Sequence, residues 1–467
     1  MRVTFAALPS GEVPAFGIMY VSAALRQAGH DVRLVEVESA AALVSALRRS
    51  PTDLLAISAT TGLHRIYLSW ARAAKRALRV PTLFGGPHPT FFPEIIDRPE
   101  VDAIVVGEGE CTAKELLEAL ATRDGRVVAG ASYKLEGRIV TGPPRPPEQE
   151  LDRLPLPDRA IYFDQNALHR TFPVKAFLAS RGCPYRCTYC FNRTLNDMYR
   201  GQSRAVRLRS PSMVVDEIRH VRRAWPTKLV WFLDANFVVS RSWVEELSSR
   251  IRREIGLPFY CKVRPNLVDE RLAHTLARGG CTGVGMGIEA GDDGLRNGLL
   301  ERNVAREQIV RACRLLHEAG ISIMSFNMVG LPGERYAQVK DTIDLNVEAG
   351  VDYAMATVFQ PYPRTVLGEW AESNGFFDGD YDRLDTNYYS TCVMREVVPG
   401  DRVRIENAQR LFALAVAFPE IRKHLDRLVE LPVGRFYTEL FKRWHSRRFF
   451  EGFYERYENP KRASLPA

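Results

Sequence analysis

Short, almost wholly apolar runs alternate with helical patterns in the first third of the chain. Met19–Ala28 has apolar residues at helical spacing and is followed by Gly29, which is typical of a helix C-cap. The apolar runs predict strands at Val3–Pro9, Val32–Val37, Leu54–Ser58, Thr82–Gly86 and Ala103–Gly107. Near-continuous apolar strands that alternate with helices predict a parallel, doubly wound α/β sheet.

Glycine-rich and polar segments follow three of these predicted strands. Ligands of doubly wound sheets bind beyond the carboxyl ends of the strands, and glycine lets the backbone approach a ligand closely. The predicted ligand-contacting residues are Ser58, Gly85, Gly86, His88, Gly107 and Gly109. His64 and His88 are candidates to line a pocket, but a surface or turn-stabilising role is favoured for each.

The middle of the chain repeats a strand–helix pattern. Prolines between residues 143 and 157 predict an extended linker over 141–172, after a first domain at 1–140. A helix is expected to begin at Ser210-Pro211, an N-cap followed by proline. Predicted strands are Val174–Ser180, Lys228–Leu233, Pro258–Arg264, Gly283–Glu289, Ser322–Met328 and Asp352–Phe359. Six βα units predict a partial (β/α)6 TIM barrel over 173–375, with active groups at the strand C-terminal ends.

The last segment, 376–467, is expected to be mainly helical. Candidate helices are Val403–Ala417 and His424–Leu431, and Pro432 with Gly434 would end the second. An aromatic-rich stretch comprises Tyr388, Tyr389, Trp444, Phe449, Phe450, Phe453, Tyr454 and Tyr457. We expect these aromatics to close the open side of the barrel as ordinary core, and a substrate-facing role for one or two of them stays open.

The composition of the chain argues against a membrane-spanning, a secreted or a nucleic-acid-binding protein. The 467 residues are 46% hydrophobic, enough for two or three domains with substantial cores, but no apolar run reaches the roughly 18 residues that a membrane span needs. No signal-peptide pattern is present, which predicts a cytoplasmic protein. The net charge of +8 comes from 64 basic and 56 acidic residues that are interspersed, which argues against a nucleic-acid substrate.

Three of the eight cysteines form a compact motif, CxxxCxxC, at Cys183, Cys187 and Cys190. This spacing lets three thiolates converge on one face of a tight loop. A cubane iron–sulfur cluster has four irons, so three ligands leave one iron open. A zinc site would need a second Cys or His pair nearby, and a disulfide would leave one cysteine over. The motif therefore predicts a [4Fe–4S] cluster.

The other five cysteines are scattered among apolar neighbours: Cys111, Cys261, Cys281, Cys313 and Cys392. We expect each to be an ordinary buried cysteine. A chain with three cluster cysteines and no disulfide framework suits a reducing compartment.

The cysteine motif resembles the signature of the radical S-adenosylmethionine (SAM) superfamily, with Tyr189 in the aromatic position before the last cysteine. The resemblance implies that SAM chelates the open iron through its amino and carboxylate groups. An external electron donor, such as flavodoxin or ferredoxin, would reduce the cluster. Cleavage of SAM would then give methionine and a 5′-deoxyadenosyl radical that abstracts hydrogen from a small-molecule substrate.

Further segments resemble SAM-contacting positions of that superfamily. Asp234 and Asn236 lie where relatives bind the methionine amino group, although Asp234 fits a helix cap equally well. Glu289, in a G-I-E-A-G segment, would accept hydrogen bonds from the ribose hydroxyls. Arg302 would pair with the SAM carboxylate, or form a surface salt bridge. Asn327 and Gly330 begin a turn that would approach adenine closely.

The turn after the last predicted barrel strand departs from the pattern. Gln360-Pro361-Tyr362-Pro363-Arg364-Thr365 has arginine where relatives have glycine. That replacement puts in doubt any backbone contact that relatives make there, and would aim a cation at the substrate instead.

The first domain resembles the cobalamin-binding, Rossmann-like domain of B12-dependent radical SAM enzymes. The similarity rests on GG-P-H-P-T-F-F-P-E followed by G-E-G-E. The classical DxHxxG loop is absent, because the turn after the first strand is Ser10-Gly11-Glu12-Val13-Pro14. Cobalamin, if bound, would therefore lack a protein imidazole beneath the cobalt.

Four functions fit these observations to different degrees. Cobalamin-dependent C-methylation of a small, biosynthetic molecule is favoured by the order of the domains. Radical dehydration, deoxygenation or ring rearrangement, for example of an aminoglycoside, is the alternative if the B12-like domain is vestigial. Methylthiolation of tRNA is disfavoured because a second cysteine triad is missing, and an electron carrier is disfavoured because it would use four protein ligands.

Overall fold

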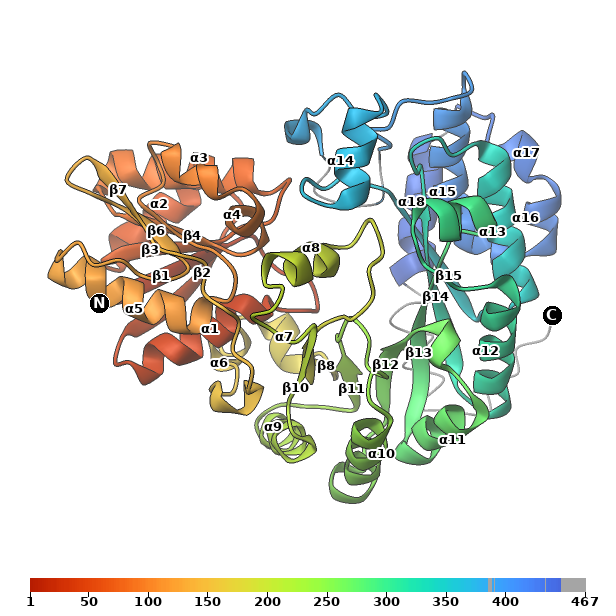
Figure 1. Cartoon of the computed structure of the whole chain (residues 1–467), viewed down its shortest axis with the longest axis horizontal. Coiled ribbons are helices and arrows are strands. Elements are labelled where there is room, and N and C mark those ends of the chain that lie inside the picture. The colour runs from red at the N-terminus through yellow and green to blue at the C-terminus, as the bar shows by residue number, and fades with distance from the viewer. Residues whose placement is uncertain (385–388, 390, 433, 447–467) are drawn as a thin grey trace. The chain divides into compact units, whose positions relative to one another are not determined.

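The computed structural model describes residues 1–467 except 385–388, 390, 433 and 447–467 (Figure 1). The chain forms two compact units. Unit 1 comprises Met1–Phe172, Asn196–Arg209 and Arg223–Pro226, and unit 2 comprises Pro173–Leu195, Ser210–Arg222 and Thr227–Ala467. The domain boundaries expected from the sequence stay predictions.

Unit 1 contains a seven-stranded sheet with the order β2-β1-β3-β4-β5-β6-β7. The first five strands are parallel and correspond to the five predicted ones. Their bounds are β1 Arg2–Ala7, β2 Asp31–Glu36, β3 Leu54–Ser58, β4 Thr82–Gly85 and β5 Ala103–Val105. The order 2-1-3-4-5 is that of flavodoxin-like sheets, so the predicted fold class is confirmed.

A hairpin of β6 (Ala131–Leu135) and β7 (Arg138–Thr141) extends this sheet in antiparallel fashion and was not predicted. Glu136 and Gly137 form its two-residue turn with φ of +51° and +78°, as a hairpin turn with two left-handed residues requires. The apolar pattern missed β7 because its residues are mostly exposed.

Helices cover both faces of the unit 1 sheet. Helices α1 and α5 pack together on one face, and α2 and α3 on the other (Figure 1). Their bounds are α1 Phe16–Gln27, α2 Ala40–Arg49, α3 His64–Leu78 and α5 Gly109–Thr122. Shorter elements are α4 Pro87–Phe91, η1 Pro93–Asp97, η2 Leu151–Arg153, α6 Ala160–Phe163, α7 Ala167–Thr171 and β10 Val206–Leu208. The proline-rich segment thus contains short helices.

Unit 2 is built on six parallel strands with the order β15-β14-β13-β12-β11-β8. Because consecutive strands are neighbours, the sheet curls into the predicted partial barrel, and all six predicted strands are present. Their bounds are β8 Val174–Phe177, β11 Leu229–Phe232, β12 Phe259–Val263, β13 Cys281–Glu289, β14 Ser322–Val329 and β15 Tyr353–Val358.

The connections between the barrel strands are mainly helical. They comprise β9 Ser180–Gly182, α8 Phe191–Met198, α9 Pro211–Ala224, α10 Arg241–Arg250, η3 Ile251–Ile255, η4 Pro265–Leu267, α11 Glu270–Gly279, η5 Gly294–Leu299, α12 Arg306–Glu318 and α13 Tyr336–Glu348. Helix α9 begins at Pro211, as its N-cap signal predicts. In the part of the chain that the structure describes, no helix is both long and apolar enough to cross a bilayer.

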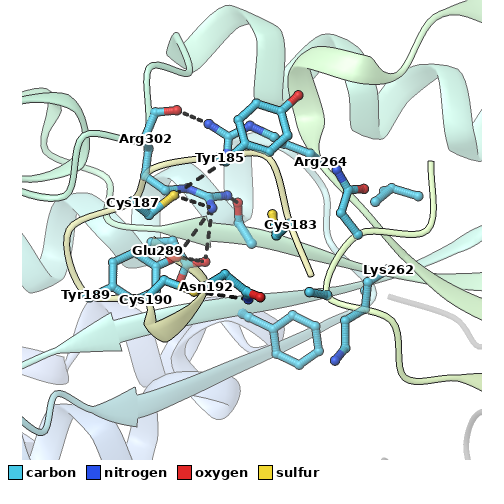
Figure 2. Close-up of a pocket in the computed structure, with 16 residues that line it drawn as sticks. Cys183, Tyr185, Cys187, Tyr189, Cys190, Asn192, Lys262, Arg264, Glu289 and Arg302 are labelled. Carbon is cyan, nitrogen blue, oxygen red and sulfur yellow. Dashed lines mark hydrogen bonds and ion pairs between the residues drawn. The ribbon is translucent and has the colours of Figure 1, made fainter. Parts of the chain in front are cut away.

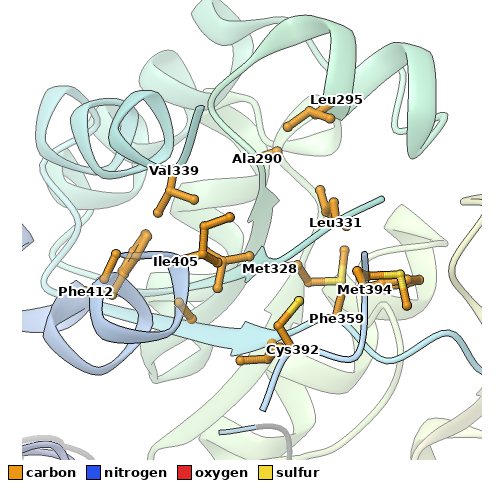
Figure 3. Packing of buried hydrophobic residues seen from close by; sticks show 14 of the residues in the cluster. Ala290, Leu295, Met328, Leu331, Val339, Phe359, Cys392, Met394, Ile405 and Phe412 are labelled. Carbon is orange, nitrogen blue, oxygen red and sulfur yellow. The ribbon is translucent and has the colours of Figure 1, made fainter. Parts of the chain in front are cut away.

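The described C-terminal region is mainly helical, with α14 Val366–Ser373, η6 Tyr381–Arg383, α15 Asp401–Ala417, α16 Pro419–Lys423, α17 Leu425–Leu428 and α18 Gly434–Ser446. Helix α15 packs on β15 and α13, and Phe412 and Ile405 join Met328, Val339 and Phe359 in one apolar cluster (Figure 3). The cluster therefore covers the β15 edge of the barrel.

Two expectations, one for this region and one for α5 in unit 1, are corrected. The predicted helix His424–Leu431 is shortened to α17, and Cys111 is partly exposed rather than buried. Trp444 packs against the apolar cluster, as the core interpretation expects. The remaining aromatics at Tyr388, Phe449, Phe450, Phe453, Tyr454 and Tyr457 lie outside the described residues.

Candidate functional site

A cavity of about 250 Å³ lies at the carboxyl ends of the barrel strands in unit 2 (Figure 2). The loop after β9 and strands β12 and β13 supply most of its lining. Lining residues are Cys183, Tyr185, Cys187, Tyr189, Cys190, Asn192, Ala235, Asn236, Lys262, Val263, Arg264, Gly285, Gly287, Glu289, Arg302 and Phe326. The three motif cysteines therefore face the same cavity.

The cysteine loop is held by hydrogen bonds of its own backbone and of Thr188. The Cys190 amide donates to the Cys187 carbonyl at 3.2 Å. The Thr188 amide donates to the Leu300 carbonyl at 3.2 Å, and its hydroxyl to the Leu299 carbonyl at 2.7 Å. None of the three cysteines is in a disulfide, and of the three only Cys187 is buried. Three such thiols on one tight loop fit a cluster with one open iron.

Nitrogen donors surround two of the sulfurs. Arg302 Nη1 lies 3.6 Å and Arg264 Nη1 3.8 Å from Cys187 Sγ, and Asn192 Nδ2 lies 3.5 Å from Cys190 Sγ. Burial raises the pKa of the Cys183 and Cys190 thiols. The charge of Arg264 partly opposes this shift in the pKa of Cys183 and so favours the thiolate form that binds iron.

Tyr189, Glu289 and Arg302 form a connected group on one wall of the cavity (Figure 2). The Tyr189 hydroxyl donates to Glu289 Oε1 at 2.9 Å, and Arg302 Nη1 lies 3.7 Å from the same oxygen. Arg302 Nη2 also donates to the Gly287 carbonyl at 2.6 Å. Burial raises the pKa of both Tyr189 and Glu289. Arg302 is thus tied to the protein and is not a surface residue.

Glu289 ends β13 with φ of +70°, in the left-handed region that residues other than glycine rarely adopt. A Cβ on Gly287 would clash with Glu289 Oε1 and lie 2.9 Å from Arg302 Nη2, so a side chain there would displace both groups. This local geometry turns the Glu289 side chain onto the cavity wall.

Asn236 is a predicted SAM contact whose hydrogen bonding is incomplete among the described residues. Its Oδ1 accepts from the Val238 amide at 3.3 Å, which fixes the amide orientation. Its Nδ2 is buried and lacks a partner among the described residues, although Asn236 lines the cavity. A buried donor without a partner is costly, so this nitrogen fits a ligand that accepts a hydrogen bond.

Asp234, Asn327 and Gly330 do not line the cavity. Asp234 accepts hydrogen bonds from the Ala179 amide at 3.3 Å and from the Ser180 hydroxyl, and burial raises its pKa. It therefore ties the end of β11 to the segment that leads into the cysteine loop. Its role in contacting SAM stays a prediction.

Asn327 is fully engaged inside the barrel. Its Nδ2 donates to the Met355 carbonyl at 3.0 Å, and its Oδ1 accepts from Asn346 Nδ2 at 2.8 Å. Gly330 has φ of +73°, and a Cβ there would lie 2.8 Å from Cys392 Sγ. Contact with Cys392 thus accounts for this glycine, and a contact with adenine stays a prediction.

Four lining residues with polar side chains were not singled out from the sequence: Tyr185, Asn192, Lys262 and Arg264. Arg264 ends the predicted strand Pro258–Arg264, so the rule that active groups lie at strand ends would have found it. Lys262, two residues earlier, shares its face of the strand. The Arg264 guanidinium lies 3.8 Å from the centroid of the Tyr185 ring, a contact between loop and strand that the sequence does not encode locally.

In unit 1, the predicted ligand residues lie at the carboxyl ends of β3, β4 and β5. Ser58 pairs with Gly85 in register, and a Cβ on Gly86, which has φ of +91°, would lie 2.8 Å from Ser58 Oγ. Gly107 has φ of +80°, and a Cβ there would clash with the Tyr199 hydroxyl. Gly109 begins α5, and a Cβ there would lie 2.9 Å from Val21.

The Tyr199 hydroxyl is buried beside Gly107 and has no hydrogen-bond partner among the described residues. Such a hydroxyl fits a polar ligand at this edge of the sheet. Sequence reasoning missed Tyr199, because it lies far along the chain from the strand ends that it approaches.

His64 and His88 are both buried, so a surface role is wrong for each. Their rings stack with centroids 4.0 Å apart. His64 Nδ1 accepts from the Gly62 amide at 3.2 Å, as a turn-stabilising residue would. His88 Nδ1 lies 3.0 Å from the Thr61 hydroxyl, and burial, followed by the His64 charge, lowers the pKa of His88 to about 3. His88 is therefore neutral near pH 7.

Comparison with known proteins finds two family models. The radical SAM superfamily matches residues 177–345, and the B12 binding domain matches residues 3–117. A relative from Pyrococcus horikoshii, the uncharacterized methyltransferase PH0819, is 29% identical over 77% of this chain and 79% of its own. The anaerobic magnesium-protoporphyrin IX monomethyl ester cyclase of Rubrivivax gelatinosus is 28% identical over 61% of this chain, which spans 52% of that protein.

Two solved structures share the fold. The radical SAM methyltransferase TsrM from Kitasatospora setae, with cobalamin and a [4Fe–4S] cluster bound, has a TM-score of 0.65 at 20% identity, covering 80% of this chain and 78% of TsrM. The cobalamin-dependent SAM radical enzyme OxsB, with aqua-cobalamin bound, has a TM-score of 0.70 at 17% identity, covering 94% of this chain and 72% of OxsB.

Proposed function

Since the chain is a radical SAM enzyme with a B12-binding domain, we propose that it methylates an unactivated carbon of a small molecule in a cobalamin-dependent reaction. Its cofactors are a [4Fe–4S] cluster, SAM and cobalamin. The substrate, the reaction outcome and the roles of individual residues below are part of the proposal.

The observation that carries the proposal is the convergence, in one cavity, of three cysteine thiols outside any disulfide and of donors that lack a partner among the described residues. Cys183, Cys187 and Cys190 would hold the cluster, whose open iron binds SAM and supplies the electron for its cleavage. Asn236 Nδ2 lacks a protein partner in the described chain and would donate to SAM. Cofactor and cosubstrate thus meet at the barrel mouth, where (β/α) barrels place their chemistry.

The cavity wall has a positioning role in this proposal. Tyr189 and Arg302 hold the Glu289 carboxylate between them, which keeps it oriented for the ribose hydroxyls. Asp234 fixes the approach to the cysteine loop through Ser180. Asn327 and Gly330 do not line the cavity and would stabilise the positions of the residues that do. These groups limit motion in the site rather than exchange protons with the substrate.

Cobalamin would bind at the carboxyl edge of the unit 1 sheet. Gly85, Gly86, Gly107 and Gly109 let the chain segments at this edge approach one another closely, and Ser58 and Tyr199 offer hydroxyl groups. His88 stacks on His64 inside unit 1 and is proposed to shape the pocket. The turn Ser10–Pro14 contains no histidine, so no imidazole from it would ligate cobalt from below.

Some relatives are named as methyltransferases and others as cyclases, so two reaction outcomes have to be distinguished for this protein. Methyl transfer is favoured by the methyltransferase names of PH0819 and TsrM. The cyclase from Rubrivivax gelatinosus supports a second outcome, in which radical chemistry alters the substrate without adding carbon, as in dehydration, deoxygenation or ring rearrangement. A cytoplasmic location and an external electron donor such as flavodoxin or ferredoxin complete the proposal.

The experiment is an anaerobic incubation of cluster-reconstituted protein with cobalamin, a low-potential reductant and SAM that carries a deuterated methyl group. Candidate small molecules are screened by mass spectrometry. Transfer of the label to a product, together with dependence on cobalamin, supports the proposal. A product that forms without label, or equally well without cobalamin, refutes methylation and supports the second outcome.

A further inference from the structure

Three cationic side chains line the cavity, and two of them are committed to the cluster side. Arg302 contacts Cys187 Sγ and pairs with Glu289. Arg264 contacts the same sulfur, donates to the Arg302 carbonyl and lies over the Tyr185 ring. Both guanidinium groups therefore compensate negative charge at the cysteine loop.

The third cation, Lys262, has a different environment. Its Nζ donates to the Leu233 carbonyl at 3.3 Å, and no ion pair joins it to a carboxylate in the part of the chain that the structure describes. In Figure 2 its ammonium group points away from the sulfurs of the labelled cysteines. Burial lowers the pKa of Lys262, while the charge of Asp234 opposes this shift. Two of its three N–H donors thus remain available to a ligand.

Nearby anions of the protein are already engaged. Asp234 accepts hydrogen bonds from Ala179 and Ser180, and Glu289 is held by Tyr189 and Arg302. An oxidised cubane held by three thiolates would carry a net negative charge, which Arg264 and Arg302 beside Cys187 would compensate. Lys262 is consequently the cavity cation whose charge the surrounding protein compensates least, a costly state for a group with restricted solvent access.

SAM does not supply the missing anion. Its carboxylate is expected to chelate the open iron together with its amino group, and its sulfonium is itself a cation. A second ligand with a negative group is therefore needed to compensate Lys262. We infer that Lys262 binds an anionic group of the substrate; this inference rests on the proposed function. The substrate is then a small carboxylic acid or a phosphorylated compound.

The test measures anion binding to the loaded enzyme rather than turnover. The full chain, with cluster, cobalamin and SAM, is titrated with inorganic phosphate and separately with acetate, against chloride at equal ionic strength. Thermal stabilisation in an anaerobic calorimeter reports binding. The test variants are Lys262→Met and the charge-retaining Lys262→Arg. Lys423→Met on α16, which removes an exposed positive charge, is the matched control.

We expect at least one of the two anions to stabilise the wild-type protein and Lys423→Met equally. Lys262→Met should bind that anion about tenfold to hundredfold more weakly, the loss expected for a charge-assisted hydrogen bond. Lys262→Arg should retain most of the effect. Equal stabilisation of wild type and Lys262→Met, or none in wild type by either anion, overturns the inference.

The electron paramagnetic resonance (EPR) spectrum of the reduced cluster separates SAM from the substrate as the partner of Lys262. Addition of SAM should alter the spectrum of Lys262→Met as it alters that of wild type. Loss of this response in Lys262→Met alone would place Lys262 on SAM and overturn the substrate assignment. A wild-type protein that forms no cluster or fails to cleave SAM would instead refute the proposed function, so the two failures are distinguishable.

Discussion

Glu334 gives a quantitative prediction that needs no cofactor. This carboxyl is buried in the turn after β14, where Oε2 accepts from the Leu331 amide at 3.0 Å and Oε1 has no partner among the described residues. Burial raises the pKa of Glu334 from 4.5 to about 8. The unfolded chain therefore releases this proton at a lower pH than the folded protein does.

The sign and size of the effect follow from this difference. Stability contributed by the neutral carboxyl is fully present below pH 4.5 and is lost as the pH rises toward 8. At about 1.36 kcal/mol per pH unit, a difference of about 3.5 units amounts to roughly 5 kcal/mol. Glutamine at position 334 keeps an acceptor for the Leu331 amide but does not ionise.

The assay compares the thermal unfolding of wild type and Glu334→Gln from pH 5 to pH 9. The two proteins should differ little near pH 5, and the variant should become the more stable one as the pH rises. Surface-exposed Glu307→Gln on α12 is the control and should show no such divergence. A stability difference that stays constant across the pH range would refute the argument from burial.

Three further predictions concern the two sites. Asn236→Ala should weaken SAM binding about tenfold, because a single donor to a charged ligand is lost. The SAM concentration that half-saturates the EPR response of the cluster measures this affinity, and an unchanged affinity would contradict the assignment. Arg264→Gln should make the midpoint potential of the cluster more negative, because a cation beside Cys187 is removed. A redox titration followed by EPR measures this potential, and an equal or more positive value in the variant would contradict the prediction. Gly107→Ala should reduce cobalamin retention and stability, since Gly107 has φ of +80° and a Cβ there would clash with Tyr199. Gly298→Ala in unit 2, where a Cβ meets nothing within 4 Å, should leave both unchanged, and equal behaviour of the two variants would refute the prediction.

The sequence predicted the two sheets well because most of the parallel strands are buried on both faces. Runs such as Leu54–Ile57 and Leu229–Phe232 are apolar without interruption, so they stand out from their neighbours. The exposed strand β7 lacks such a run and was missed. The apolar pattern continues to Leu431, so the predicted helix His424–Leu431 is longer than α17, which ends at Leu428.

The candidate site was predictable where its residues are adjacent in the chain. Cys183, Cys187 and Cys190 share one loop, so their spacing alone indicates convergence on one cavity. The contacts of Arg264 with Tyr185 and Cys187 join segments about eighty residues apart, and only the folded barrel places them together. Burial of His88 and the Gly330–Cys392 contact depend on tertiary packing in the same way.

The central claim is that Cys183, Cys187 and Cys190 hold a [4Fe–4S] cluster that cleaves SAM. The most direct measurement is the rate of 5′-deoxyadenosine formation from SAM by anaerobically reconstituted wild type and Cys187→Ala, with iron and sulfide determined for each protein. Cys392→Ala, which alters a buried cysteine outside the motif, is the matched control. The account predicts 5′-deoxyadenosine from wild type and Cys392→Ala and none from Cys187→Ala; an equal rate from Cys187→Ala would contradict it.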